Sequence, residues 1–172
     1  IIESLYLGRN IIGSFSNIET LKNVTIGNAV TNINNIFNRC SGLTSIVVKS
    51  GNIVYDSRDN CNAIIETATN TLIAGCKRTI IPNSVTSIGY RAFWGCTGLT
   101  EITIPNSVTS IGEEAFSFNS SITTVFLPDS VTSIGKKAFW GCESITSVEI
   151  GKGVTSIGED AFNGCSALTS VI

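Results

Sequence analysis

The chain has 172 residues and a formal net charge of -2, with 42% hydrophobic residues and only 14% charged residues. It is long enough to bury a sizeable core, and its net charge argues against an electrostatic nucleic-acid binder, which needs a basic face. No apolar run approaches the length of a membrane span. We therefore expect no nucleic-acid partner and no membrane insertion by this segment.

The sequence contains no histidine and no methionine. The missing histidine removes the commonest general base and the commonest zinc ligand. We therefore expect no catalytic residues, no metal site and no cofactor, with a carboxylate enzyme using Glu101 and Glu149 as a remote alternative. The absent initiator methionine and the abrupt stop at Ile172 predict a piece of a longer chain.

The N-terminal part of the chain contains weak copies of a repeated pattern. Residues 1–20 fit poorly, although Leu5 and Leu7 predict a strand of an eroded first unit. Residues 21–42 form the first clear unit, and a second unit over residues 43–75 is interrupted by an excursion around residues 50–75.

The excursion has the pattern of a β-hairpin. Its segments AIIE and TLIA flank a turn at residues 67–70, which places Glu66 opposite Thr71. Counting back along this register places Cys61 opposite Cys76, so a cross-strand disulfide and two reduced thiols are both open interpretations. The segment DSRDN lacks the oxygen spacing and the glycine of a calcium loop. Tyr55 and this loop are candidate partner contacts, because long insertions often carry function.

After the excursion the repeat becomes nearly perfect. Near copies begin with IPNSVTSIG at Ile81 and Ile104, with LPDSVTSIG at Leu127 and with IGKGVTSIG at Ile150. A phenylalanine recurs every 23 residues, at Phe93, Phe116, Phe139 and Phe162. A period of this length indicates an array of stacked units. We predict one domain over residues 1–172, whose further repeats cover residues 76–98, 99–121, 122–144 and 145–167, with a truncated repeat at 168–172.

Each unit reads as one coil. Leu99, Ile102 and Ile104 predict a short strand, which Pro105 ends because proline cannot donate to a sheet ladder. The segment 113–116 predicts one turn of helix. A unit this small cannot bury its apolar face alone, so we expect neighbouring coils to cover it and Phe116 to lie between them.

Stacking predicts straight columns of equivalent side chains. Signs alternate along two charged columns, Arg91, Glu114, Lys137 and Asp160, and Tyr90, Glu113, Lys136 and Glu159. We favour inter-coil ion pairs over a charged docking strip, because alternation cancels any long-range field. A further column holds Cys40, Cys96, Asn119, Cys142 and Cys165. Small buried residues are the favoured interpretation over a metal or redox ladder, since no CxxC motif accompanies them.

Two further sets of side chains are candidate partner contacts. One set points outward from the strands and contains Arg78, Ile80, Glu101, Thr103, Thr124, Phe126, Ser147 and Glu149. The other is the column of Trp94 and Trp140, with Ser117 between them. These tryptophans either stack on sugar rings or pack against the adjoining turn.

The motif LxxIxIPxxVxxIGxxAFxxCxx, which begins at Leu99 with Asn119 in the cysteine position, resembles the BspA-like leucine-rich repeats. The excursion also resembles the extended unit of bacterial members. This resemblance implies a right-handed, β-rich leucine-rich repeat solenoid, in which a parallel ladder of short strands alternates with short helical or 3-10 turns.

Family members are surface and secreted proteins of gut and oral bacteria and of some parasitic protists, and they are associated with adhesion. The resemblance therefore implies an extracellular or cell-surface location. It also implies a non-catalytic, adhesion-type module whose partner is a host or bacterial surface protein or a glycan. A structural spacer that displays a neighbouring domain is the alternative, and the plain Thr and Ser columns favour it.

Overall fold

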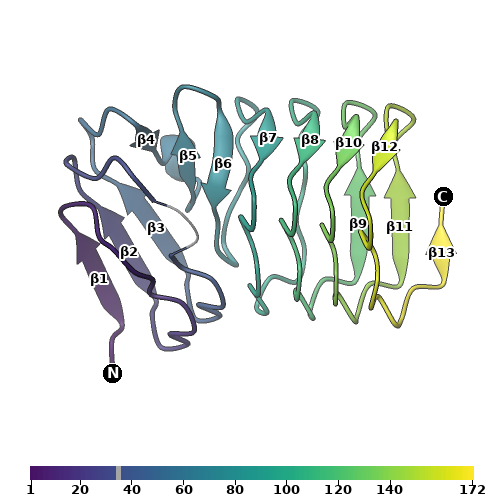
Figure 1. Ribbon diagram of the computed structural model, residues 1–172, viewed down its shortest axis with the longest axis horizontal. Coiled ribbons are helices and arrows are strands. Elements are labelled where there is room, and N and C mark those ends of the chain that lie inside the picture. The colour runs from purple at the N-terminus through teal and green to yellow at the C-terminus, as the bar shows by residue number, and fades with distance from the viewer. Residues whose placement is uncertain (34–35) are drawn as a thin grey trace.

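The computed structural model describes residues 1–33 and 36–172, and it is a solenoid of stacked coils with the two termini at opposite ends (Figure 1). Short parallel strands from successive coils pair along its length. This confirms the predicted leucine-rich repeat architecture.

Two three-stranded parallel sheets line one side of the coils. The N-terminal sheet contains β1 (Ser4–Leu7), β2 (Asn23–Ile26) and β3 (Ser45–Val48). The C-terminal sheet contains β9 (Thr124–Leu127), β11 (Ser147–Ile150) and β13 (Ser170–Val171). Both follow the apolar alternation of the repeat, because every second residue faces the core.

A second ladder is built from the Ser-Ile pair that each repeat contains. Its strands are β7 (Ser87–Ile88), β8 (Ser110–Ile111), β10 (Ser133–Ile134) and β12 (Ser156–Ile157). They pair in register, with serine beside serine and isoleucine beside isoleucine. The structure therefore contains the predicted columns of equivalent side chains.

The excursion forms the predicted hairpin and one additional strand. Its elements are β4 (Tyr55–Asp56), the 3-10 turn η1 (Arg58–Asn60), β5 (Ile64–Glu66) and β6 (Thr71–Ala74). Strands β4, β5 and β6 are antiparallel, and β6 then pairs in parallel with β7. The hairpin thus joins the second ladder instead of leaving the solenoid.

The hairpin register corrects the predicted cysteine pairing. Glu66 lies opposite Thr71 as expected, but a bulge between Ile64 and Ile65 shifts the register beyond that point. Cys61 and Cys76 do not face one another across the strands, and both are buried free thiols.

The predicted helical turn at residues 113–116 is also wrong. The segment is a hydrogen-bonded turn in which Glu114 has a left-handed φ of 53°. The amide of Glu114 donates to Lys136 O at 2.9 Å, and that of Phe116 donates to Ala138 O at 2.7 Å. These donors pair with the next coil, so they cannot close a helix within their own coil.

A column of stacked aromatic rings forms the centre of the C-terminal core. The ring centroids of Phe93 and Phe116 are 5.0 Å apart, those of Phe116 and Phe139 are 5.1 Å apart, and each pair is nearly parallel. Phe162 continues the column at 5.2 Å. The column ends at Gly75, where an added Cβ would lie 2.1 Å from Cε1 of Phe93.

Candidate functional site

The outward side chains predicted to bind a partner lie on what we call the strand face, the outer side of β9, β11 and the equivalent segments 78–81 and 101–104. Across the two strands, Thr124 lies beside Ser147 and Phe126 beside Glu149. The exposed fraction is 74% for Ile80 and 55% for Phe126. Both apolar side chains therefore present contact area to solvent.

The strand-face residues gather in two sets. A groove of about 370 Å³ is lined by one set, Arg78, Ile80, Glu101 and Thr103. A groove of about 270 Å³ is lined by the other, Thr124, Phe126, Ser147 and Glu149. Glu101 and Glu149 fall in different grooves, so the structure does not pair the two carboxylates as an acid and a base.

The ladder of the strand face is interrupted at the first set. Segments 78–81 and 101–104 are not strands, which corrects the strand predicted from Leu99, Ile102 and Ile104. Within the described residues, no backbone hydrogen bond joins residues 100–104 to a neighbouring coil. These amides and carbonyls therefore remain available to solvent or to a partner.

Tyr55 does not form part of a contact surface, which corrects the prediction. Its side chain is only 5% exposed, and its hydroxyl lies 3.2 Å from Ile33 N and 3.3 Å from Thr31 O. Tyr55 was expected to contact a partner because long insertions often carry function, but its hydroxyl forms hydrogen bonds with backbone groups of the preceding coil.

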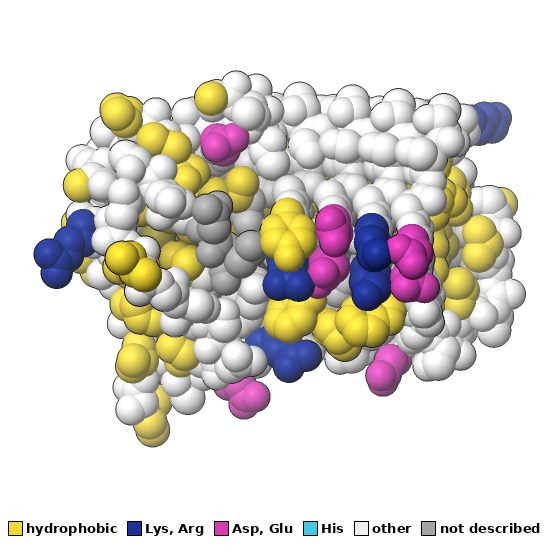
Figure 2. Space-filling model, viewed as in Figure 1, with side chains coloured by type: hydrophobic (Ala, Val, Ile, Leu, Met, Phe, Trp, Pro, Cys, Tyr) yellow, Lys and Arg dark blue, Asp and Glu magenta, His cyan; other side chains and the backbone are white. Residues whose placement is uncertain are grey.

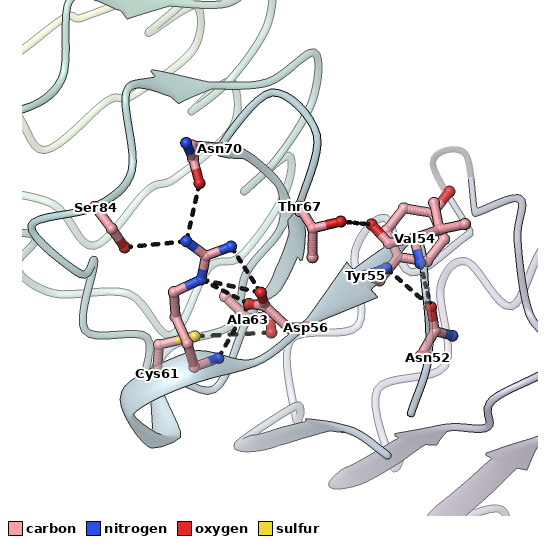
Figure 3. Close-up of polar contacts among 10 residues, drawn as sticks. Asn52, Val54, Tyr55, Asp56, Cys61, Ala63, Thr67, Asn70 and Ser84 are labelled. Atoms are coloured by element: carbon pink, nitrogen blue, oxygen red, sulfur yellow. Dashed lines mark hydrogen bonds and ion pairs between the residues drawn. The ribbon is translucent and has the colours of Figure 1, made fainter. Parts of the chain in front are cut away.

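The charged residues of the excursion have a structural role. The Arg58 guanidinium donates to both carboxylate oxygens of Asp56, at 2.6 Å for the shortest contact. It also donates to Asn70 Oδ1 at 2.9 Å, and Figure 3 shows Asp56, Asn70 and Ser84 converging on this group. These contacts bind the loop to the hairpin turn and to the following coil.

Trp94 and Trp140 are half-buried and form a cluster with a third aromatic side chain. Phe118 lies between them, with ring centroids 5.4 Å from Trp94 and 4.8 Å from Trp140. The Arg39 guanidinium lies 4.6 Å from the Trp94 centroid, and Lys137 Nζ lies 4.8 Å from that of Trp140. These cations lie over the indoles, so the geometry favours packing over sugar stacking for both tryptophans.

The sequence prediction placed Ser117 between the tryptophans and missed Phe118. Ser117 is buried, whereas Phe118 has a left-handed φ of 60° and occupies the place of Gly95 and Gly141. Arg39, with φ 56°, occupies the same place in its own coil. A large residue at a repeat glycine was the signal that could have revealed both.

The charged columns contain ion pairs, as predicted. Arg91 makes a two-pronged contact with Glu114, at 2.9 and 3.0 Å, and Lys136 Nζ lies 2.5 Å from Glu159. Figure 2 shows the blue and magenta side chains alternating over the C-terminal coils, with yellow aromatic side chains directly beneath. In the described part of the chain, neither Lys137 nor Asp160 takes part in an ion pair.

The cysteine column is a row of buried hydrogen-bond donors. Sγ of Cys142 lies 3.1 Å from Phe116 O, and Sγ of Cys165 lies 3.3 Å from Phe139 O. Asn119 fills the same role, with its Nδ2 donating to Phe93 O at 2.9 Å. Burial raises the pKa of Cys96 and of Cys142 to about 12 and that of Cys61 to about 11. Thiols of this kind are unreactive.

Alkylation should reveal this burial directly. We expect the folded protein to resist iodoacetamide at about pH 9, because a raised pKa keeps the thiols protonated. All six cysteines should react after unfolding without a reductant. Mass spectrometry counts the adducts, and a count of four would instead restore the disulfide between Cys61 and Cys76.

Over residues 1–33 and 36–172, no three or more cysteine or acidic side chains come together as metal ligands. In the same described ranges, no helix has the length and hydropathy of a membrane span.

The comparisons with known proteins agree with this geometry. A family model described as the BspA type leucine rich repeat region matches residues 10–71 and 74–172 with six copies. No curated protein matches the chain.

Several solved structures have a similar fold. A leucine-rich cell surface protein from Faecalibacterium prausnitzii A2-165 is 29% identical with a TM-score of 0.62, over 88% of this chain and 47% of that chain. A leucine-rich repeat protein from Eubacterium ventriosum ATCC 27560 is 22% identical with a TM-score of 0.68, over 88% and 48%. The pneumococcal vaccine antigen PcpA is 20% identical with a TM-score of 0.61, over 98% and 47%. This chain thus spans about half the length of each.

Proposed function

We propose, from the premise that this chain belongs to the family of BspA-type leucine-rich repeat proteins, that it is a non-catalytic recognition module of a cell-surface or secreted bacterial protein. The solved leucine-rich cell surface protein with 29% identity supports the location. The partner is a protein or a glycan of a host or bacterial surface, and the strand face is the contact region.

The observation that carries this proposal is the exposure of apolar side chains on a rigid strand face. Ile80 and Phe126 are 74% and 55% exposed, although the same column holds Thr103 in the coil between them. Exposed large side chains beside polar groups are typical of contact points. The interrupted ladder at residues 100–104 adds unpaired backbone groups to the same surface.

The repeat itself supplies a variant that tests the strand face. Because threonine already occupies the column at Thr103, we expect the double variant Ile80→Thr and Phe126→Thr to fold with an unchanged melting temperature. Its affinity for a captured matrix protein or surface glycan should fall by about 30-fold, the effect of losing about 2 kcal/mol of binding energy.

Binding is measured by surface plasmon resonance against purified matrix proteins and a glycan array. Tyr90→Lys, which installs the residue of Lys136 at an exposed position on another surface, is the matched control. If the parent protein binds none of these, or if the double variant binds as tightly as the parent, the proposal is wrong.

A structural spacer is the second candidate, and the threonine column favours it. Thr109, Thr132 and Thr155 each donate a side-chain hydrogen bond to a threonine carbonyl of the preceding coil, at 3.2, 3.0 and 3.1 Å. These bonds occupy hydroxyl donors that would otherwise be available to a ligand. They also repeat from coil to coil, so they hold the coils at a regular spacing. Unchanged partner binding by a longer protein from which these coils are deleted would support the spacer.

A further inference from the structure

One corner of the solenoid joins coils that are not consecutive. Arg39 N donates to Trp94 O at 3.1 Å, just as Gly95 N donates to Ser117 O at 2.8 Å one coil further on. The excursion unit, residues 43–75, contributes no turn of its own at this corner. Residues 21–42 therefore stack directly on residues 76–98 there.

This direct stacking creates a continuous groove of about 430 Å³ along the corner. We call it the corner groove. Its lining residues form two rows, one of Asn17, Arg39, Gly95, Phe118 and Gly141, and one of Glu19, Ser41, Thr97, Ser120 and Glu143. The rows cross five coils, so at one strand spacing per coil the groove extends for roughly 20 Å.

The Arg39 side chain is oriented but its hydrogen-bond donors are free. Its guanidinium carbon lies 4.6 Å from the Trp94 centroid and 5.1 Å from the Phe118 centroid. In the described part of the chain, the side chain of Arg39 makes no hydrogen bond or ion pair. A planar donor held by two rings in this way is arranged in advance for ligand oxygens.

The second row consists of carboxylates and hydroxyls. Glu19 and Glu143 lie toward its two ends, with the hydroxyls of Ser41, Thr97 and Ser120 between them. Within residues 1–33 and 36–172, none of these five side chains has a hydrogen-bond partner. Free carboxylates can accept hydrogen bonds from the hydroxyls of a ligand, and free hydroxyls can both donate and accept.

We propose that the corner groove binds a neutral oligosaccharide of several units. Sugar hydroxyls match the carboxylate acceptors and the Arg39 donors, and the part of the half-buried Phe118 ring that lines the groove adds apolar contact for sugar C–H groups. Two carboxylates to one guanidinium make the groove net negative, which opposes an acidic saccharide. This site adds a ligand to the proposed recognition function, and it uses a surface separate from the strand face.

The repeat again supplies variants that preserve the fold. Phe118→Gly installs the residue that Gly95 and Gly141 place in the same column, and Arg39→Asn installs the residue of Asn17. Both replacements suit a left-handed backbone, and thermal melting checks that each variant remains folded. Phe126→Thr is the matched control on the strand face.

The test uses saturation-transfer NMR and calorimetry with maltotetraose, cellotetraose, laminaritetraose and chitotetraose, and with tetragalacturonic acid as the acidic comparison. We expect at least one of them to bind with a Kd on the order of 1 mM or tighter, and more tightly than its monosaccharide. Phe118→Gly and Arg39→Asn should each weaken binding at least about tenfold, and Phe126→Thr should leave it unchanged.

Three results would overturn the proposal. They are the absence of binding by all four tetrasaccharides, tighter binding of an acidic tetrasaccharide, and loss of binding in Phe126→Thr with no loss in the two groove variants. The last result would place the glycan on the strand face, so it would support the proposed function while removing this site. Failure of the strand-face double variant alone would leave the corner groove intact.

Discussion

Replacing Phe116 by alanine should destabilise the protein by about 3 to 5 kcal/mol, which is the cost of emptying a fully packed aromatic site. Phe116 is fully buried, and its ring stacks on both sides against Phe93 and Phe139 at 5.0 and 5.1 Å. The stacked rings cannot close the gap, because the hydrogen bonds of the adjacent turns fix the coil spacing.

Urea denaturation followed by circular dichroism measures the loss. Phe126→Ala is the control, since the same change on the exposed strand face should alter stability by no more than about 0.5 kcal/mol. Equal midpoints for the Phe116 variant and the parent would contradict the packing described above.

Gly135→Ala should also be strongly destabilising, by about 1 to 3 kcal/mol or more. A Cβ at this position would lie 2.5 Å from Gly112 C and 2.5 Å from Glu113 N of the preceding coil. Both neighbours are backbone atoms, and they are held in place because Gly135 N donates to Ile111 O at 2.8 Å. The glycine is therefore required for the close approach of two coils, not for an unusual φ.

The comparison that checks this prediction is Gly8→Ala. Gly8 is exposed, and its added Cβ would meet only the Tyr6 side chain, at 3.1 Å. Thermal melting should show a drop of at least about 2 °C for Gly135→Ala and little change for Gly8→Ala. Equal melting temperatures would show that the coils are free to separate at this column.

Much of the fold could be predicted because the same pattern of apolar and polar residues recurs in each repeat. Ile88, Ile111 and Ile134 align in the structure where the 23-residue period places them. The ion pair of Arg91 with Glu114 was predicted from the same 23-residue spacing. A period fixes which residues are equivalent, and stacking then makes equivalent residues neighbours.

The errors arose where an interaction between coils overrode a local preference. The segment around Glu114 has helix-forming residues, but its amides pair with the next coil. The alternating sequence gives no sign of the hairpin bulge between Ile64 and Ile65. The predicted position of Cys61 opposite Cys76 was therefore wrong.

The corner groove could not be predicted for a different reason. Arg39 and Phe118 come together only because the excursion unit omits one corner, and sequence spacing does not reveal which corner is omitted. The candidate contacts on the strand face, in contrast, follow from alternation along the strands, and the structure shows them exposed or half-buried.

The hairpin divides the hydrophobic core of the solenoid into two clusters. Ile64 packs with the N-terminal core and Ile65 with the C-terminal core, and the ring column stops at Gly75. In a linear array, stability is transmitted only between neighbours, so the weakest junction sets the limit of a partly unfolded state. We therefore expect the N-terminal core to melt before the core of the near-identical repeats, so that urea unfolding shows two steps instead of one.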